Sequence, residues 1–430
     1  MSDLLAARAQ MAMSLGFHIV FAAVGIAMPV LMVIAEWCWQ RTGDPVYLNL
    51  AQRWAKGTAI LFAVGAVSGT VLSFELGLLW PHFMGWAGAI IGMPFSLEGF
   101  AFFLEAIFLG VYLYGWNRVS PKAHLFAGFV VALSGAASGV FVVIANSWMN
   151  TPTGFEIING QVANVDPIAA MLNPAAFSEC LHMLLASYAA TGFAVAGIHA
   201  FFLLRHPMEK FHRAALAIAL TVGGATAIVQ PLSGDLVARS VAHNQPAKLA
   251  AFEAHYKTQS GAPLKIIGPL EVPNGLSLLI YHRMDARVKG LDDFAPADRP
   301  PVTPVRISFQ IMVAAGTAMA MVGACWFWLL WKRRDFPSSK LFLRMVLASA
   351  PLGFLAVETG WVVTEVGRQP WIIYGFMRTR EAVTPMPGLI VPFLTLTTLY
   401  IFLSFIVAWM LIRHISDVPL STTNNDASSD

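Results

Sequence analysis

The run "SLGFHIVFAAVGIAMPVLMVIAEW", residues 14–37, carries one carboxylate near its end and no lysine or arginine. It is long enough to cross ~30 Å of hydrocarbon, which takes about 20 helical residues. It is also too long for the apolar part of a signal peptide and has no small-residue cleavage site. Similar runs recur along the chain, so we predict an all-α polytopic membrane protein with about nine transmembrane helices. The predicted spans are residues 15–37, 57–79, 97–117, 124–146, 181–204, 214–232, 305–331, 341–363 and 389–413.

The composition supports this class. Hydrophobic residues make up 57% of the 430 residues and charged residues only 12%, whereas soluble globular proteins have apolar shares of about 45–50% and charged shares of about 25%. The net charge of +3 is too small to indicate a nucleic-acid partner. The three cysteines lie far apart and form no CxxC pair, so we interpret them as packing residues rather than metal ligands.

Basic residues in short loops indicate the orientation, because such loops stay on the cytoplasmic side. They follow the first, third, fifth and seventh spans: Arg41, Arg53, Lys56, Arg118, Lys122, Arg205, Lys210, Arg213, Lys332, Arg333, Arg334 and Lys340. The loop after the eighth span, with Arg368, Arg378 and Arg380, goes against this trend. The majority predicts that the N-terminus lies outside and the C-terminus inside.

The spans divide the chain into four parts. Residues 1–232 hold six transmembrane helices, and residues 305–413 hold three more. Between them, residues 233–304 form a polar external loop that we expect to contain some amphipathic helix. Residues 414–430, which end in "STTNNDASSD", have the low-complexity polar composition of a disordered tail and would be cytoplasmic.

Five residues on five different spans fall in the outer half of the membrane in this orientation: His18, Glu98, His182, Met312 and Glu358. We expect Glu98 at the outer start of its span and Glu358 near the outer end of its own. Intramembrane carboxylates are functional by default. Histidine and methionine hold haem iron, and a His/Met pair gives an electron-transfer centre. Taken singly, each histidine can be an interfacial hydrogen-bonding residue and Met312 a core filler.

A second carboxylate, Glu105, follows Glu98 by seven residues, which places both on one helix face about 10 Å apart along the axis. Ser138 on the next span can lie at a depth comparable to that of Glu105. Carboxylates and hydroxyls in such a row suit a proton relay. The alternative is that Glu105 is a neutral, hydrogen-bonded side chain that braces two helices.

Several stretches resemble subunit I of the cytochrome bd-type ubiquinol oxidases, in the family's order and up to about Arg413. They are "GFHIVF" (16–21), "SLEGFAFFLEA" (96–106), "IANSWMNTP" (144–152), "FQIMVAAG" (309–316) and "GWVVTEVGRQPW" (360–371). The resemblance implies a haem-bearing subunit of a bacterial terminal oxidase in the inner membrane. It also implies that this enzyme oxidises ubiquinol and reduces O2 to water, with electrogenic proton transfer but no pumping.

The resemblance also implies cofactors, partners and residue roles. The cofactors are two haem b and one haem d, or a third haem b, and the partners are a second membrane subunit and a small single-helix subunit. His182 and Met312 match the axial ligands of a low-spin haem b, His18 the ligand of the oxygen-site haem, and Glu358 that of a high-spin haem b. The remaining matches are Glu98 beside the oxygen site, Glu105 and Ser138 in a proton channel, Lys248 and Glu253 in quinol oxidation, and Arg368 and Trp371 at the haem propionates.

Departures from the family pattern leave some questions open. Gln310 stands where many relatives have arginine, and Asn117 where aspartate is common. The external loop is of the short type, frequent in the cyanide-insensitive branch, so the sequence does not decide between haem d and haem b. Arg368 can also pair with Glu365 as a structural clamp, and Trp371 can belong to an interfacial aromatic belt.

A proton-coupled transporter or channel without haem is the alternative from another class. It explains Glu98, Glu105 and Glu358, but it does not explain a histidine and a methionine at matching depth.

Overall fold

The computed structural model describes residues 1–266, 270–333, 336–337 and 339–416. In this part of the chain, nine helical segments are long and apolar enough to cross a membrane, as predicted. They are α1 (Asp3–Thr42), α2 (Pro45–Leu79), α3 (Pro81–Tyr114), α4 (Pro121–Asn150), α6 (Ala176–Arg205), α7 (Lys210–Asn244), α10 (Val302–Arg333), α11 (Lys340–Ser349) with α12 (Leu352–Val366), and α14 (Ile390–Ser416).

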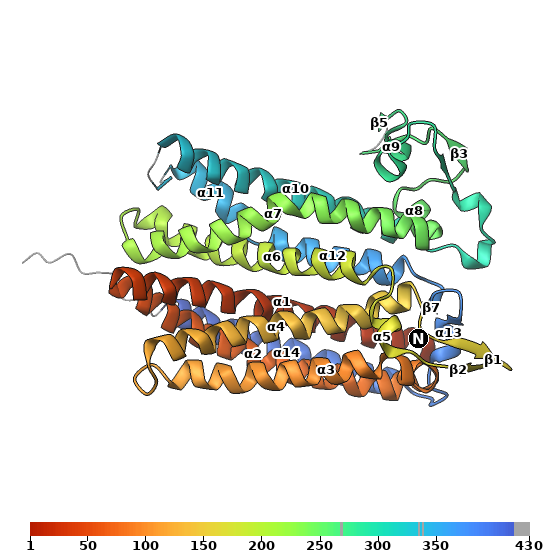
Figure 1. The fold of residues 1–430 in the computed structure, drawn as a ribbon, viewed down its shortest axis with the longest axis horizontal. Coiled ribbons are helices and arrows are strands. Elements are labelled where there is room, and N and C mark those ends of the chain that lie inside the picture. The colour runs from red at the N-terminus through yellow and green to blue at the C-terminus, as the bar shows by residue number, and fades with distance from the viewer. Residues whose placement is uncertain (267–269, 334–335, 338, 417–430) are drawn as a thin grey trace, which may run out of the picture.

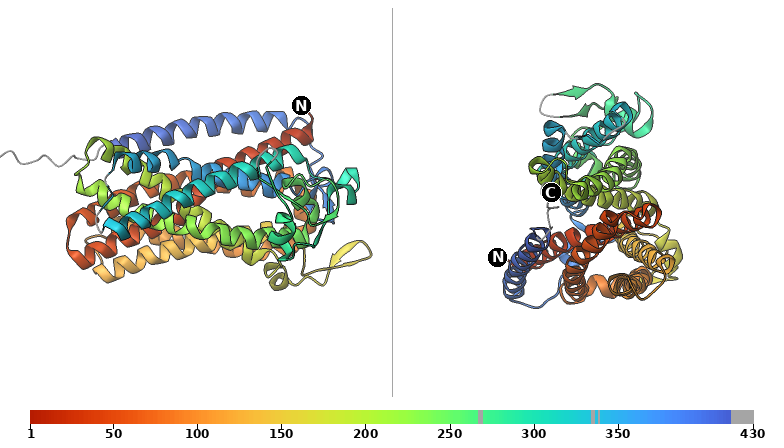
Figure 2. Two further views of the ribbon diagram at one scale, coloured as in Figure 1. Left: turned by 90° about the horizontal axis from the view of Figure 1, so that it is seen from above. Right: turned by 90° about the vertical axis from the view of Figure 1, so that its left-hand side faces the viewer.

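The long helices run roughly parallel or antiparallel and form two adjoining groups (Figures 1 and 2). One group contains α6, α7, α10, α11 and α12, and the other contains α1–α4 and α14. The groups meet where α6 packs against α1 and α4. The largest cluster of buried apolar side chains spans this junction.

Short elements gather at the end of the bundle that holds the N-terminus, called here the N-terminal end (Figure 1). The helices are α5 (Pro167–Met171), α8 (Pro246–Phe252), α9 (Gly275–Tyr281), α13 (Thr379–Ala382), η1 (Leu291–Asp293) and η2 (Pro296–Asp298). Four antiparallel pairs of strands accompany them: β1 (Glu156–Ile158) with β2 (Gln161–Ala163), β3 (Gln259–Ser260) with β6 (Arg287–Val288), β4 (Leu264–Lys265) with β5 (Glu271–Val272), and β7 (Trp371–Ile373) with β8 (Met377–Arg378).

Most helices extend beyond the predicted spans, because a hydropathy pattern marks only the apolar middle of a long helix. α3 begins at Pro81 rather than near residue 97, so Glu98 lies near the middle of this helix and not at its start. α7 continues to Asn244, so the first part of the predicted 233–304 loop is helical. An ion pair between Asp235 and Arg239, four residues apart, supports this extension.

The predicted span 341–363 is interrupted. α11 ends at Ser349 and α12 begins at Leu352, with Pro351 between them. Proline has no backbone N–H to donate and its ring clashes with the preceding turn, which accounts for the break. Of the predicted disordered tail, residues 417–430 lie outside the described residues.

Glycines allow the closest helix contacts, as expected where helices pack in lipid. A methyl group added at Gly192 of α6 would lie 2.6 Å from the Cα of Gly223 on α7. One added at Gly323 of α10 would lie 2.8 Å from the Cα of Gly224, also on α7. α7 is therefore in near backbone contact with two neighbours, and no larger side chain fits at these positions without moving a helix.

We expect Gly192→Ala to destabilise the protein by about 1–3 kcal/mol, because the added methyl group overpacks the contact between α6 and α7. Gly316→Ala in α10 is the matched control, since a methyl group there meets no atom within 4 Å. The control should be neutral or slightly stabilising, because alanine favours a helix more than glycine does. Thermal unfolding in detergent compares the two; equal midpoints would contradict the close-contact interpretation.

Candidate functional site

Two histidines on different helices are held by the same arrangement. His18 Nδ1 lies 3.0 Å from the hydroxyl oxygen of Ser68 on α2. The Ser68 hydroxyl donates its own hydrogen to the carbonyl oxygen of Val64 at 2.9 Å. Ser68 is thus left to accept the hydrogen from Nδ1, and the lone pair of the histidine is placed on Nε2. A ring fixed in this way is prepared to bind a metal through Nε2.

His182 repeats the arrangement on the other helix group. Its Nδ1 lies 3.0 Å from the hydroxyl oxygen of Ser233 on α7, and Ser233 donates to the carbonyl oxygen of Gln230 at 2.9 Å. The Gln230 amide also donates to the backbone oxygen of His182 at 3.0 Å. The same amide nitrogen lies 3.2 Å from Nδ1 and 3.3 Å from Nε2 of His182. With Nδ1–H donated to Ser233, Nε2 is again the electron-pair donor, but here it can accept from Gln230, and a metal would have to replace that amide.

Each of the four predicted iron ligands faces a glycine on a neighbouring helix. A methyl group would lie 2.9 Å from His18 if added at Gly69, and 3.6 Å from His182 if added at Gly234. The corresponding distances are 3.3 Å from Gly16 to Glu358 and 3.2 Å from Gly360 to Met312. Glycine permits a close approach of backbone to a bound group. The four glycines thus leave room for the four predicted ligand side chains to lie close against neighbouring helices.

The same contacts place three of these residues in a row. Gly16, which faces Glu358 of α12, is two residues from His18 on α1. Gly360, which faces Met312 of α10, is two residues from Glu358 on α12. The Oε1 atom of Glu358 is buried and has no hydrogen-bond partner among the described residues. A metal ion would supply that partner, so the donor set fits iron-bound haem groups.

The carboxylates of α3 lie against α4. Ser138 of α4 donates to Glu98 at 3.4 Å, and Gly135, one turn earlier on α4, faces Glu105. Glu105 is buried, and methyl groups at Gly135 of α4 and Gly25 of α1 would lie 3.2 and 3.8 Å from its Oε1 atom. The shared helix face of Glu98 and Glu105 is retained.

At the N-terminal end of the bundle, a buried polar network joins the last residue of α4 to α8 and to the segment that follows α12. The Arg368 guanidinium pairs with Glu365 at 2.6 Å. Asn150 at the end of α4 accepts hydrogen bonds from Lys248 at 3.0 Å, from Gln245 at 3.1 Å and from Arg368 at 3.4 Å. The clamp between Arg368 and Glu365, considered above as an alternative, is therefore present.

Trp371, at the end of the "GRQPW" stretch, lies outside this network. The Arg378 guanidinium lies 5.0 Å from the centre of its ring, a cation–π contact that ties β7 to β8.

Lys248 and Glu253 have separate partners, although both lie at α8. Burial lowers the pKa of Lys248 to about 7, and the nearby Glu179 carboxylate opposes this shift. Burial raises the pKa of Glu253 to about 7, against the opposing charges of Arg306 and Lys265. Both groups thus exchange protons near neutral pH, as a site that couples electron and proton transfer requires. A cavity of about 240 Å³ borders Asn150, the hydrogen-bond partner of Lys248.

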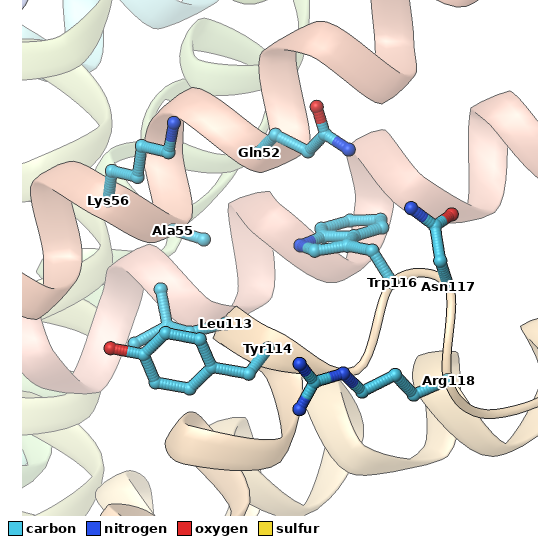
Figure 3. Close-up of a pocket in the computed structure, with 8 residues that line it drawn as sticks. All are labelled: Gln52, Ala55, Lys56, Leu113, Tyr114, Trp116, Asn117 and Arg118. Carbon is cyan, nitrogen blue, oxygen red and sulfur yellow. The ribbon is translucent and has the colours of Figure 1, made fainter.

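The two departures from the family pattern lie at opposite ends. Gln310 donates to the carbonyl oxygen of Ile266 in the long loop at 3.1 Å. Asn117 lines a pocket of about 410 Å³ at the end opposite the N-terminus (Figure 3). Lys56 and Arg118 line the same pocket, so its mouth is polar and basic.

The sequence analysis did not identify Ser68, Ser233, Glu179 or Asn150 as members of the site. Each lies on a different helix from the residue that it supports, so periodicity along one helix contains no signal for it. Asn150 does fall inside the quoted "IANSWMNTP" stretch. The resemblance of this stretch to the family was the only sequence signal for any of these four residues.

Comparisons with known proteins agree on one family. The model described as cytochrome bd terminal oxidase subunit I matches residues 6–419. Over the full length of both chains, 36% of residues are identical to a putative cytochrome bd menaquinol oxidase subunit I of Bacillus subtilis (strain 168). The cytochrome bd ubiquinol oxidase subunit 1 of the same organism is 32% identical, over 98% of this chain and 97% of its own. The structure of bd oxidase from Geobacillus thermodenitrificans is similar with a TM-score of 0.91 and 38% identity, covering 97% of this chain and 99% of that one.

We expect Asn150→Ala to lower the free energy of unfolding by about 2–3 kcal/mol, because it leaves buried Lys248 and Arg368 without their shared acceptor. The exposed Asn117 provides the control: Asn117→Ala should stay within about 0.5 kcal/mol of the parent protein. Thermal unfolding measures both, and limited proteolysis after α8 reports whether that helix has loosened. A stable, protease-resistant Asn150→Ala variant would show that the network is not required there.

Proposed function

The chain belongs to the family of cytochrome bd terminal oxidase subunit I, and on this basis we propose a role for each residue of the candidate site. Because it belongs to this family, the protein is subunit I of a haem-containing quinol oxidase and a multi-pass protein of the bacterial membrane. The family assembles subunit I with subunit II and uses quinol and O2 as substrates. The haem-free transporter considered above is not supported.

The ligand assignment rests mainly on one observation, the matching serine-held histidines. We assign His182 and Met312 to a low-spin haem b, His18 to the oxygen-site haem and Glu358 to a high-spin haem b. The haems supply one-electron transfer and O2 chemistry when bound. An imidazole and a thioether together fill both axial positions of an iron, which suits a relay and excludes oxygen from that centre. The complement is two haem b with one haem d, or three haem b.

Arg368 and Trp371 are assigned to the haem propionates. Arg368 is nearly fully buried and already bound to Glu365. Its Nε atom is buried and has no hydrogen-bond partner among the described residues, and its NH1 atom makes only a long bond to Asn150, so these N–H groups are left to bind a further carboxylate.

The orientation of the protein in the membrane is assigned from the basic residues in the connections between helices. The connections between α1 and α2, α3 and α4, and α6 and α7 lie at the end opposite the N-terminus, and they carry basic residues named in the sequence analysis. The positive-inside rule supports placing this end in the cytoplasm. The pocket around Asn117 then opens on the cytoplasmic side, and Glu105, Ser138 and Glu98 pass protons from there toward the oxygen site. α8 and its neighbours lie outside, where quinol protons leave, so turnover is electrogenic without pumping.

The quinol site is assigned to residues around α8, within the loop 233–304. Quinol oxidation releases protons as electrons leave, so the site needs a base that is free at neutral pH. Glu253 supplies that base and Lys248 a hydrogen-bond donor. We take ubiquinol as the donor and expect a small single-helix subunit in addition to subunit II.

Replacing Met312 by leucine tests the haem assignment, because leucine preserves bulk but removes the sulfur ligand. The reduced-minus-oxidised spectrum of the wild-type protein should show haem bands. In Met312→Leu the low-spin signal should shift toward high spin or to a lower potential, while the oxygen-site haem persists. His182→Ala should abolish both the low-spin signal and quinol oxidation. An unchanged low-spin spectrum and potential in Met312→Leu would return this residue to the role of core filler.

The pH dependence of quinol oxidation tests Glu253 and Lys248. Glu253 gains its basic form as pH rises through about 7, and Lys248 loses its charge over the same range. We therefore expect a bell-shaped profile of kcat/KM with a maximum near pH 7. Glu253→Gln should remove the rising limb and lower the rate by about 100-fold, and Lys248→Met should remove the falling limb, with all haems retained. Profiles identical to that of the parent would exclude both residues from quinol oxidation.

A further inference from the structure

A buried carboxyl group that the proposed electron and proton paths do not use lies between α1, α2 and α14. Glu75 of α2 is 3% exposed. Its Oε1 atom accepts hydrogen bonds from the Gln10 amide at 2.8 Å and from the Ser14 hydroxyl at 2.9 Å. No salt bridge involves Glu75 within the described ranges.

Two acceptor atoms at Glu75 and Gln10 would be satisfied by one additional hydrogen. Glu75 Oε2 and Gln10 Oε1 are both buried, and neither has a donor among the described residues. If the carboxyl group were ionised, two buried acceptors and an unpaired negative charge would lie inside the membrane, which costs several kcal/mol.

A proton on Oε2 removes both problems. The acid can then donate to Gln10 Oε1 while the Gln10 amide donates to Glu75 Oε1. The result is a closed ring of two hydrogen bonds between a carboxylic acid and a primary amide.

The position of this pair relates it to the proposed oxygen site. Ser14 precedes His18 by about 6 Å along α1, and Ser68, which holds His18, lies two turns before Glu75 on α2. Glu105 lies on the other side of His18, because it faces Gly25 of the same helix. Glu75 therefore borders the site from the N-terminal end, opposite the proposed proton relay.

A third helix contributes a hydroxyl group to the cluster. Tyr400 of α14 stacks on Phe17 with ring centres 4.4 Å apart, and it interacts electrostatically with Glu75. Its hydroxyl oxygen is buried and lies close to Ser14, whose hydroxyl donates to Glu75. This hydroxyl can relay a proton from the acid by accepting it while passing on its own.

We infer that Glu75 is a neutral carboxylic acid that stores an exchangeable proton for the oxygen site, with Gln10 as its positioning residue. The inference rests on the proposed function, since a stored proton is useful where oxygen reduction consumes protons. The step is an acid–base exchange without electron transfer. The O–H bond at Oε2 breaks as its proton is relayed through the Tyr400 hydroxyl to the oxygen site, the carboxylate keeps its bonds from Gln10 and Ser14, and a proton from water then forms a new O–H bond at Oε2.

Glu75→Gln separates proton storage from bracing of the three helices. Two primary amides form the same ring of two hydrogen bonds, so the variant should keep the haem spectrum and the thermal midpoint. It cannot release a proton, so proton uptake during oxygen reduction by the fully reduced enzyme should slow by about ten-fold or more. Wild-type proton uptake in this variant would reduce Glu75 to a structural brace and overturn the proposal.

Infrared spectroscopy provides a measurement that does not depend on activity. The wild-type protein should show a carboxylic-acid carbonyl band that shifts in D2O, persists from about pH 6 to pH 8 and is lost in Glu75→Gln. In Gln10→Met the acid remains but the ring is broken, so the band should move rather than disappear. If no band depends on Glu75 or Gln10, the carboxyl group is ionised and the inference is wrong. Absence of haem from the wild-type protein would instead refute the proposed function, and the infrared band would still report on Glu75.

Discussion

A polar group inside a bilayer has no water to bond, and this constraint governs how the interior of the protein is built. A histidine ring in the membrane needs a partner for Nδ1, and a serine on the next helix supplies it for both His18 and His182. Each serine hydroxyl is in turn satisfied by a backbone carbonyl of its own helix. The serine that satisfies the hydrogen-bond requirement of Nδ1 therefore also leaves Nε2 as the electron-pair donor, the nitrogen proposed to bind iron.

The same constraint explains why so few polar groups remain unsatisfied, and why those that do are informative. Among the described residues, Glu358 Oε1 has no donor, and the carboxyl group faces a glycine of α1 in the helix group across the junction. Glu75 Oε2 has no donor there either, but the neighbouring Gln10 amide has an oxygen that can accept a hydrogen from it. We therefore proposed a metal ion as the partner of the first carboxyl group and a proton for the second, because the two groups have different neighbours.

Small residues and a buried network determine how the helices are joined. Glycines bring α6, α7 and α10 into near backbone contact, which fixes the distance between helices that bear proposed haem ligands. At the N-terminal end, Asn150 connects α4 to α8 and to Arg368. This network links the proposed quinol site to the helix of Glu358. In the proposed function, electrons would thus enter, and quinol protons leave, through a part of the protein that is joined to the haem-binding helices.

The sequence alone determined the number of membrane helices, because hydrophobic length is a property of each segment by itself. It also identified, through quoted motifs such as "GWVVTEVGRQPW", the family and the residues proposed to bind haem. It could not determine helix ends, since the polar last turns of α7 leave no hydropathy signal, and the start of α3, residues 81–96, contains glycines and Pro94, which do not indicate a helix. Only the tertiary structure paired Ser138 with Glu98 and Glu75 with Gln10, and only it showed that the pair of Arg368 with Glu365, open in the sequence, is formed. Two of these contacts join residues on different helices, and partners on different helices are chosen by packing, which no pattern along one helix contains.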